Sequence, residues 1–277
     1  MNIGIDIGGT HTGIGIVDDQ GKIVDLNILN YERGTGTADL IFDYVNGYLR
    51  KNAYQYDIDS IGIGVPGIVT GTSISYTVNL PLGNTDVRDY IQTDLPVFLS
   101  NDSNCAAIAE YEVIDKKFYS DYALITIGTG IGTGIILNRK LYQGSAGGAG
   151  ELGHTVIEKD GIRCKCGRRG CFEQYASISA LKRMTGLDNT KEIFYLAETN
   201  ASIQNILDEY IEYLSEGLAN FINLFDVEML VIGGGLSNYG DKFISKLKTR
   251  ISEKICNKYT YELNLKTAFL KNDAGII

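Results

Sequence analysis

The sequence predicts an α/β protein of two similar lobes, each built around a β-meander, with a structural zinc loop in the second lobe. Three observations support this prediction. A pattern of strand, glycine turn and strand opens the chain at residues 3–17 and returns at 122–137. Apolar residues recur at helical spacing after both copies, at 39–53 and 206–225. One histidine and three cysteines gather between residues 154 and 171.

The composition is that of an ordinary globular protein and argues against several classes of function. Its 277 residues suffice for about two domains or one large one. Hydrophobic residues make up 44% and charged residues 21%, which allows a full core. The net charge of −9 argues against nucleic acid or an anionic membrane as a partner. No apolar run approaches the ~18 residues of a membrane span and the start lacks a signal peptide, so we expect a cytoplasmic protein.

The first meander is predicted from apolar strands at 3–7, 13–17 and 23–29, joined by turns. Asp6 ends the first strand, beside the turn Gly8-Gly9-Thr10. A turn rich in backbone N–H groups can cradle a phosphate, and a carboxylate beside it can hold Mg²⁺. On these residues alone, a plain hairpin explains the glycines equally well.

A helix at 39–53, a strand at 61–65 and a short strand at 97–99 follow. The last strand leads into Asn101 and Asp102, and an alanine-rich helix covers 105–113. Asp102 therefore lies at a strand-to-helix junction. Asp is a favoured N-cap residue, so the local pattern by itself favours a capping role for Asp102.

The second meander has a strand at 122–127, a glycine run at 128–134 and a strand at 135–137. Shifted back by 120 positions, Ile127 and Gly128 fall on Ile7 and Gly8, and Ile136 falls on Ile16. We interpret this as a weak internal repeat. A dinucleotide-binding fingerprint would need a helix directly after the glycines, whereas a strand follows them here.

The zinc loop, residues 151–173, contains His154, Cys164, Cys166 and Cys171. One nitrogen and three sulfurs form a closed tetrahedral set for Zn²⁺, so the metal would be structural. Glu151 and Glu173 flank the ligands and would be held in place by them. The alternatives are buried thiols or one disulfide, and a disulfide does not suit a cytosolic chain.

The remainder is predicted as helices alternating with strands. Ser177 is expected to cap a helix. A long helix is expected at 206–225, and its stripe of apolar residues should face the core or another subunit. A strand at 229–232 runs into Gly233, Gly234 and Gly235, and a further helix and a last strand at 263–269 follow. The expected N-terminal lobe is 1–115, with 263–277 as a candidate to return to it, and the C-terminal lobe is 116–262.

Together these features resemble the ROK family of sugar kinases and related repressors. The resemblance rests on Asp6-Ile-Gly-Gly-Thr10, the glycine run at 128–134, Gly233 to Gly235, Glu151-Leu-Gly-His154 and the sequence 164–173. It implies the actin- and hexokinase-like (ribonuclease H-like) fold. It also implies Mg-ATP as a substrate, a structural zinc ion and a homodimer.

The resemblance implies an ATP-dependent hexose kinase, with glucose as the first candidate and Asp102 as general base toward the 6-hydroxyl. Asp6 would help to hold Mg²⁺. The residues implied in sugar binding are Gly67, Asn79, Asn101, Asp102, Glu151, His154 and Glu173. Those implied in ATP binding are Asp6, Gly8, Gly9, Thr10, His11, Thr12, Gly128, Thr129, Gly130, Gly132, Gly234 and Gly235.

The chain departs from the family pattern at two places. His11 stands where many members have lysine, and the family usually continues into a helix where this chain stops at Ile277. The chain opens on its first strand, without the DNA-binding domain of the repressor branch, which favours the kinases. Same-fold alternatives are an N-acetylmannosamine or N-acetylglucosamine kinase, and an alternative of another class is a sugar-binding regulator without turnover.

Overall fold

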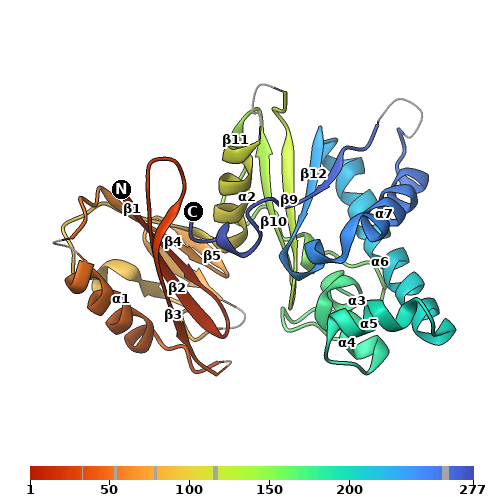
Figure 1. Ribbon diagram of the computed structural model, residues 1–277, viewed down its shortest axis with the longest axis horizontal. Coiled ribbons are helices and arrows are strands. Elements are labelled where there is room, and N and C mark those ends of the chain that lie inside the picture. The colour runs from red at the N-terminus through yellow and green to blue at the C-terminus, as the bar shows by residue number, and fades with distance from the viewer. Residues whose placement is uncertain (33, 53–54, 78–79, 115–117, 258–261) are drawn as a thin grey trace. The chain divides into compact units, whose positions relative to one another are not determined.

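The computed structural model describes residues 1–32, 34–52, 55–77, 80–114, 118–257 and 262–277 (Figure 1). The chain divides into two compact units, which are described separately. The first unit contains Met1–Ala109, Gln143–Ala149 and Asn272–Ile277, and the second contains Glu110–Tyr142 and Gly150–Lys271.

The first unit is built on a mixed five-stranded sheet. Its strands are β1 (Asn2–Ile7), β2 (His11–Val17), β3 (Ile23–Asn30), β4 (Ser60–Val65) and β8 (Val97–Asn101), in the order β3-β2-β1-β4-β8. The first three strands form the predicted antiparallel meander, and β4 and β8 are parallel to β1. The carboxyl ends of β1, β4 and β8 therefore meet at one edge of the sheet.

Helix α1 (Ala38–Asn52) packs on this sheet with its apolar stripe, and Ile41 and Val45 are fully buried in the same core as Ile5 and Ile63. The C-terminal residues lie against the middle of β1 and β2. A side chain at Gly4 would place its Cβ 1.7 Å from the Ile276 carbonyl oxygen, so this close approach requires glycine.

A small second sheet in this unit, of β5 (Ile68–Thr70), β6 (Ser73–Tyr76) and β7 (Thr85–Asp86), was not predicted. The short 3₁₀ helix η1 (Val87–Asp89) follows it. These strands have two to four residues each, too few for a periodic pattern to show in the sequence.

The second unit repeats the topology of the first. Its sheet consists of β9 (Tyr122–Ile127), β10 (Ile131–Leu137), β11 (Lys140–Leu141), β12 (Met229–Gly233) and β13 (Leu265–Thr267), in the order β11-β10-β9-β12-β13. As in the first sheet, the first three strands are antiparallel and the last two are parallel to the first. The internal repeat predicted from the glycine turns is therefore visible in the strand order and directions.

The register of the repeat differs from the prediction by one residue after the turn. Ile16 pairs with Ile3, whereas Ala123, 120 positions after Ile3, pairs with Ile135. Ile135, not Ile136, is thus the counterpart of Ile16, because the second turn is one residue shorter. Strand β10 also begins at Ile131, so that Gly132 and Gly134 lie within a strand and not in the predicted turn.

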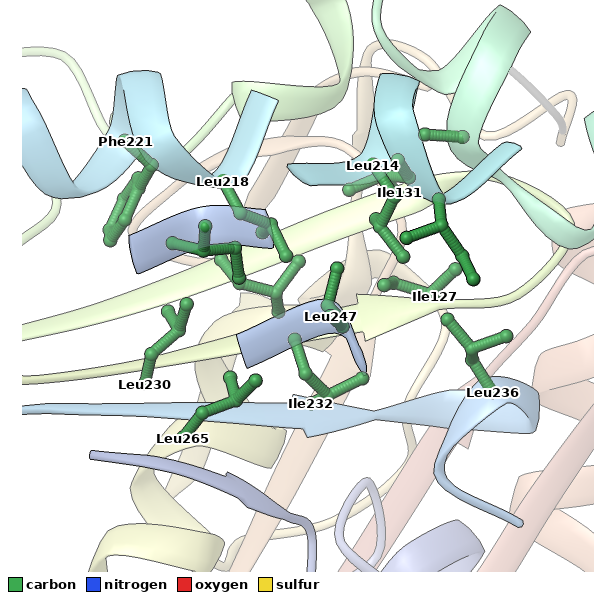
Figure 2. Close-up of a cluster of buried hydrophobic side chains, with 14 of the residues drawn as sticks. Ile127, Ile131, Leu214, Leu218, Phe221, Leu230, Ile232, Leu236, Leu247 and Leu265 are labelled. Carbon is green, nitrogen blue, oxygen red and sulfur yellow. The ribbon is translucent and has the colours of Figure 1, made fainter. Parts of the chain in front are cut away.

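Helices cover the second sheet. They are α3 (Glu173–Ala176), α4 (Ile178–Thr185), α5 (Thr190–Ala197), α6 (Ala201–Phe225) and α7 (Gly240–Lys254), with the 3₁₀ helices η2 (Leu152–His154) and η3 (Gly234–Tyr239). The 3₁₀ helix η4 (Lys271–Asp273) follows β13, and its last two residues belong to the first unit. The side chains of Leu214 and Leu218 on α6 lie among those of the strands, such as Ile232 (Figure 2). The apolar stripe of α6 thus packs into the core of its own unit, which is the first of the two predicted alternatives.

Local capping explains where these helices begin. The Ser177 hydroxyl accepts a hydrogen bond from the Ala180 N–H at 3.1 Å, which confirms the predicted N-cap of α4. Asn189 and Asn200 cap α5 and α6 in the same way. No helix in the described part of the chain is long and apolar enough to cross a membrane.

Candidate functional site

The first glycine turn, residues 8–11, connects β1 to β2. The Gly8 N–H donates to the His11 carbonyl oxygen at 2.8 Å and closes the turn. The hydroxyl of Tyr31 lies 2.7 Å from the Gly8 carbonyl oxygen and 2.9 Å from that of His11. Thr12 is fully buried, and its hydroxyl is 2.9 Å from the Tyr31 hydroxyl. The Thr12 side chain therefore bonds to Tyr31, a residue for which the sequence analysis had assigned no role.

Asp6 precedes this turn in β1 and has a crowded carboxylate. A Cβ on Gly275 would lie 2.6 Å from the Asp6 Oδ2 atom, so the C-terminal segment passes directly beside it. Burial raises the pKa of Asp6 to about 6, and the negative charge of Asp102 adds to the increase. A carboxyl group with this pKa is largely ionised at neutral pH.

Asn101 and Asp102 lie where β8 ends and α2 (Asp102–Val113) begins. The Asn101 Oδ1 atom accepts hydrogen bonds from the Ser103 N–H at 2.9 Å and the Asn104 N–H at 3.3 Å. The capping role that the local pattern favoured for Asp102 therefore belongs to Asn101. The Asn101 amide also donates to the Gly67 carbonyl oxygen at 3.0 Å, which joins two residues of the predicted sugar-binding set.

Asp102 is thus available for another role. Its Oδ1 atom accepts from the Ser103 N–H at 2.7 Å and from the Ser103 hydroxyl at 3.3 Å. Burial raises the pKa of Asp102, and the hydrogen bonds from Ser103 oppose the increase. A partly buried carboxylate that is oriented through one oxygen is a suitable proton acceptor.

Cys105 lies beside these two carboxylates. A Cβ on Gly64 would be 3.5 Å from both the Cys105 sulfur and the Asp102 Cα, which places the thiol and Asp102 on the same side of β4. Burial raises the pKa of the Cys105 thiol to about 12, and the charges of Asp102 and Asp6 add to the increase. The thiol is therefore a packing group at neutral pH and a poor nucleophile.

Gly67 has φ +146°, and a Cβ there would lie 2.0 Å from the Tyr76 carbonyl oxygen, so its backbone conformation requires glycine. Asn79, which the resemblance also implied in sugar binding, lies outside the described residues.

The second glycine turn, residues 128–130, is closed by a hydrogen bond from the Gly128 N–H to the Gly130 carbonyl oxygen at 3.0 Å. The Gly128 carbonyl oxygen accepts from the N–H of Ile178, the first residue of α4, at 2.9 Å. A Cβ on Gly130 would lie 2.8 Å from the Glu173 Oε2 atom. Gly234, at φ +73°, would bring a Cβ within 2.6 Å of the Ile127 carbonyl oxygen. The neighbours of the second glycine turn are therefore Glu173 at the end of the zinc loop, Ile178 at the start of α4, and Gly234 directly after β12.

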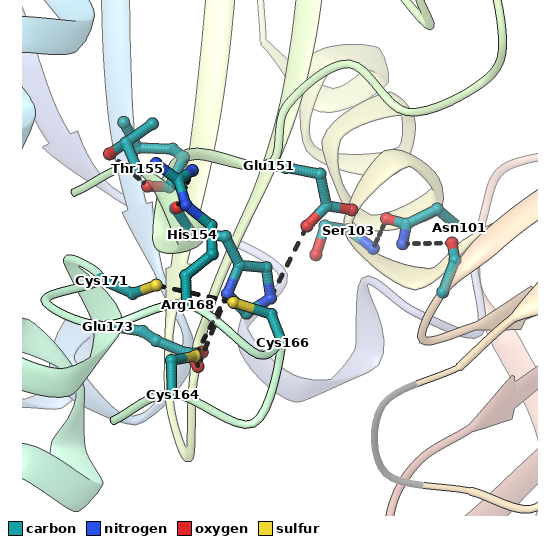
Figure 3. Close-up of polar contacts among 12 residues, drawn as sticks. Asn101, Ser103, Glu151, His154, Thr155, Cys164, Cys166, Arg168, Cys171 and Glu173 are labelled. Atoms are coloured by element: carbon teal, nitrogen blue, oxygen red, sulfur yellow. Dashed lines mark hydrogen bonds and ion pairs between the residues drawn. The ribbon is translucent and has the colours of Figure 1, made fainter. Parts of the chain in front are cut away.

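The four predicted zinc ligands converge (Figure 3). The ligand atoms of His154, Cys164, Cys166 and Cys171 all lie within 4.8 Å of one another. The Cys164 sulfur is 3.6 Å from His154 Nδ1, and the Cys166 and Cys171 sulfurs are 3.6 Å apart. Zinc bonds of about 2.3 Å to sulfur and about 2.0–2.1 Å to nitrogen place tetrahedral ligand atoms about 3.5–3.8 Å apart. The donor set and its spacing fit a structural zinc ion.

Backbone turns bring the cysteines together. The Cys164 N–H donates to the Arg168 carbonyl oxygen at 2.8 Å, and the Gly167 N–H donates to the Cys164 carbonyl oxygen at 3.2 Å. Gly167 and Gly170 have positive φ, and a Cβ on Gly170 would lie 1.7 Å from the Glu158 carbonyl oxygen. The two glycines let the chain reverse between its second and third sulfur ligands.

Both flanking carboxylates lie against the cluster. Glu173 Oε1 is 3.1 Å from the Cys164 sulfur and 3.7 Å from His154 Nδ1. Glu151 Oε2 is 3.8 Å from His154 Nε2. His154 therefore turns one nitrogen toward the sulfurs and the other toward a carboxylate, as metal-binding histidines commonly do.

The predicted residues thus form two groups, one in each unit. The first unit brings together Asp6, the first glycine turn, Gly67, Asn101 and Asp102. The second brings together the second glycine turn, Gly234, Glu173 and the metal ligands. Tyr31 and Ser103 were not predicted as site residues, because the hydrogen bonds of Tyr31 to the turn and of Ser103 to Asp102 have no local sequence signal.

Comparisons with known proteins agree with these observations. The model of the ROK family matches residues 2–277. A glucokinase of Streptomyces coelicolor is 35% identical over 187 residues, 66% of this chain and 58% of that protein. A xylose repressor of Bacillus spizizenii is 33% identical over 75% of this chain and 53% of that protein. An N-acetylmannosamine kinase of Yersinia pestis is 34% identical over 65% of this chain and 62% of that protein.

Among solved structures, a ROK family glucokinase of Streptomyces griseus, in complex with glucose and AMPPNP, has a TM-score of 0.85 and 29% identity. The similarity covers 99% of this chain and 96% of that one. The curated relatives are matched over less of their length, since the aligned part spans 53% to 62% of the three proteins above.

Proposed function

Because the chain belongs to the ROK family, whose members include sugar kinases and repressors, we propose that it is an ATP-dependent kinase of a hexose or hexosamine. Its fold is the actin-like ATPase fold implied by the resemblance. The observation that carries the proposal is the partly buried carboxylate of Asp102, released from helix capping by Asn101 and oriented through Ser103. A carboxyl group whose pKa is raised by desolvation is typical of the acids and bases of catalytic sites.

Asp102 is proposed as the general base. Phosphoryl transfer requires positioning and charge neutralisation more than covalent chemistry. Asp102 would accept the proton of the attacking sugar hydroxyl as the bond to phosphorus forms, and its raised pKa makes it a better acceptor. Asn101, fixed between Gly67 and the start of α2, would bind a neighbouring hydroxyl.

The two glycine turns are proposed to bind the phosphates of ATP through backbone N–H groups. Asp6 would help to hold Mg²⁺, which neutralises phosphate charge when it is bound. Gly234 and Gly235, where β12 runs into η3, would lie against the adenosine, as the resemblance implies.

The zinc loop is proposed to present Glu151, His154 and Glu173 to the sugar. With Nδ1 bound to zinc, His154 keeps Nε2 for a hydrogen bond, and the metal would fix the ring. Carboxylate oxygens and a ring N–H suit a neutral polyol, because its hydroxyls both donate and accept hydrogen bonds.

Glucose is the first substrate to test, because a glucokinase is 35% identical and a glucokinase with bound glucose is a close structural match. N-acetylmannosamine is the second, since the Yersinia pestis kinase is 34% identical, and N-acetylglucosamine remains the third. A non-catalytic sugar-binding regulator is the candidate of another class, favoured by the identity with the xylose repressor over 75% of the chain.

An ADP-release assay over these three sugars and fructose, on zinc-loaded protein, tests the proposal. Turnover of one sugar at a rate well above the sugar-free background would support the kinase and identify its substrate. Sugar binding measured by calorimetry, without ADP release from any of the four, would favour the regulator.

A further inference from the structure

Tyr31 lies directly after β3 and contacts the first glycine turn through its backbone and its hydroxyl group. Its N–H donates to the Thr10 carbonyl oxygen at 2.9 Å, which extends the pairing of β2 and β3 by one residue. Its ring is packed so closely against Gly36 that a Cβ there would lie 2.6 Å from a ring carbon, and 3.1 Å from Leu80. The position of the phenol ring is therefore fixed by the backbone hydrogen bond to Thr10 and by the packing of the ring against Gly36.

The hydroxyl of Tyr31 has three partners, all of them in or beside the turn. They are the Gly8 carbonyl oxygen at 2.7 Å, the His11 carbonyl oxygen at 2.9 Å and the Thr12 hydroxyl at 2.9 Å. A phenol has one proton, which the two carbonyl oxygens share, and its oxygen can accept the proton of the Thr12 hydroxyl at the same time. With the bond from the backbone N–H, one residue contacts the turn at four points.

These contacts set the direction of the N–H groups of the turn. In a trans peptide the C=O and the following N–H point in opposite directions, and the described residues contain no cis peptide bond. Because the Gly8 carbonyl points toward the phenol, the Gly9 N–H points away from it. The Thr10 carbonyl points toward the Tyr31 N–H, so the His11 N–H also points away from Tyr31.

The phenol keeps its proton under the conditions in which a kinase works. Burial raises the pKa of Tyr31, the hydrogen bond with Thr12 opposes the increase, and the charge of Asp6 adds to it. A neutral phenol is the form that can donate to a carbonyl oxygen.

We propose that Tyr31 is a positioning residue, which orients the N–H groups of the first glycine turn toward the phosphates of a nucleoside triphosphate. This inference rests on the proposed function, and it adds a residue that does not touch the nucleotide itself. Removal of the hydroxyl takes its hydrogen bond from the Gly8 carbonyl group and leaves the His11 carbonyl group with the bond from the Gly8 N–H. The peptide plane between Gly8 and Gly9 can then rotate, and the Gly9 N–H loses its fixed direction.

The test compares Tyr31→Phe with Tyr48→Phe. Tyr48 lies on α1 of the same unit and donates to Asp25 Oδ2 at 2.6 Å, so each variant removes one phenolic hydroxyl and keeps its ring. A second variant, Thr12→Val, removes only the threonine partner. The measurements are the Kd of AMPPNP by calorimetry, without sugar, and the KM values for ATP and for the sugar.

We expect Tyr31→Phe to weaken AMPPNP binding and raise the KM for ATP by roughly 3- to 10-fold, which is the effect of one lost hydrogen bond. The KM for the sugar and the far-ultraviolet circular dichroism should stay at wild-type values. Thr12→Val should shift the same two quantities in the same direction by less, and Tyr48→Phe should shift neither.

Equal AMPPNP affinity in Tyr31→Phe and wild-type protein would overturn the inference and leave the proposed kinase intact. An equal loss of affinity in Tyr48→Phe would also overturn it, because the effect would then be one of general stability. Wild-type protein that binds no AMPPNP at all would overturn the proposed function together with this inference.

Discussion

The first strand of each sheet ends in a glycine turn, but the two turns are supported by different parts of the chain. In the first sheet, Ile7 pairs with Thr12, so residues 8–11 form the turn, and Tyr31 at the end of the third strand supports it. In the second sheet, Ile127 pairs with Ile131, so only residues 128–130 form the turn.

The second turn takes its support from elsewhere. Its third strand, β11, has two residues against eight in β3 and reaches no further than Leu141. The N–H of Ile178 and the carboxylate of Glu173 adjoin the second turn instead, and Glu173 also contacts Cys164 and His154. One topology therefore contains two turns of the same kind: the first is supported by its own meander, and the second by residues next to the cluster of His154 and three cysteines.

The largest expected effect, on both activity and protection from hydrogen exchange, is that of removing the zinc ion. A structural zinc ion contributes on the order of 10 kcal/mol or more to the folding of its loop. Removal of zinc, or Cys166→Ser, should therefore reduce activity by at least about 100-fold and expose the loop to hydrogen exchange. Protection should also fall at residues 128–130 and 173–178, while residues 8–11 keep theirs, because Tyr31 supports them independently of the cluster.

Hydrogen exchange with mass spectrometry would measure this difference. Cys256→Ser is the matched control, since Cys256 is exposed and outside the cluster. Equal loss of protection at both glycine turns would show that the turns are not supported separately.

The second prediction uses the charge beside the first turn. Asp6 precedes that turn, whereas Thr126, 120 positions later, is neutral. The folded-state pKa of Asp6, about 6, is above the ordinary value of 3.8. Asp6 therefore contributes stability that is fully present below pH 3.8 and is lost as the pH rises through 6. The loss amounts to about 3 kcal/mol, because one pKa unit corresponds to about 1.36 kcal/mol.

Urea unfolding at a series of pH values would check this prediction. The free energy of unfolding of Asp6→Asn, relative to wild type, should rise between about pH 4 and about pH 7. Thr126→Val should show no such trend. A constant difference between Asp6→Asn and wild type across that range would mean that Asp6 has an ordinary pKa in the folded protein.

A smaller effect is expected from the close approach of Glu173 to the second turn. A Cβ on Gly130 would lie 2.8 Å from Glu173 Oε2, whereas a Cβ on Gly128 would meet nothing within 4 Å. Gly130→Ala should displace the carboxylate and raise the KM for the sugar by roughly 3- to 10-fold, the loss of about one hydrogen bond. Gly128→Ala should change it by less than about 2-fold. Indistinguishable KM values for the two alanine variants would argue against a role of Glu173 in sugar binding.

Comparison of the two units also shows which features could be predicted from the sequence. Alternating apolar residues and glycine turns predicted both meanders, because those signals are local. Four metal-binding side chains within 18 residues predicted the cluster, from His154 to Cys171, because the chemistry of the donor set restricts its geometry. The long apolar stripe on α6 likewise predicted a buried helix.

Contacts between residues that are distant in the sequence could not be predicted. Asn101 and Asp102 are both favoured capping residues, and only the hydrogen bonds of the folded chain show that Asn101 caps α2. The glycines at 128–134 permit a turn of several lengths, so the one-residue difference in register was not visible. A tyrosine after a strand, as at Tyr31, is too common to indicate support of a turn.

The kinetics of Asp102→Asn test most directly whether Asp102 is a general base, because the substitution keeps the shape of the side chain and removes its ability to accept a proton. Asp86→Asn, another carboxylate of the first unit that accepts a backbone N–H, is the control. We predict that kcat of Asp102→Asn falls by about 100-fold or more, while the Kd of the sugar changes by less than about 10-fold. A kcat within about 10-fold of wild type would contradict the assignment of Asp102 as general base.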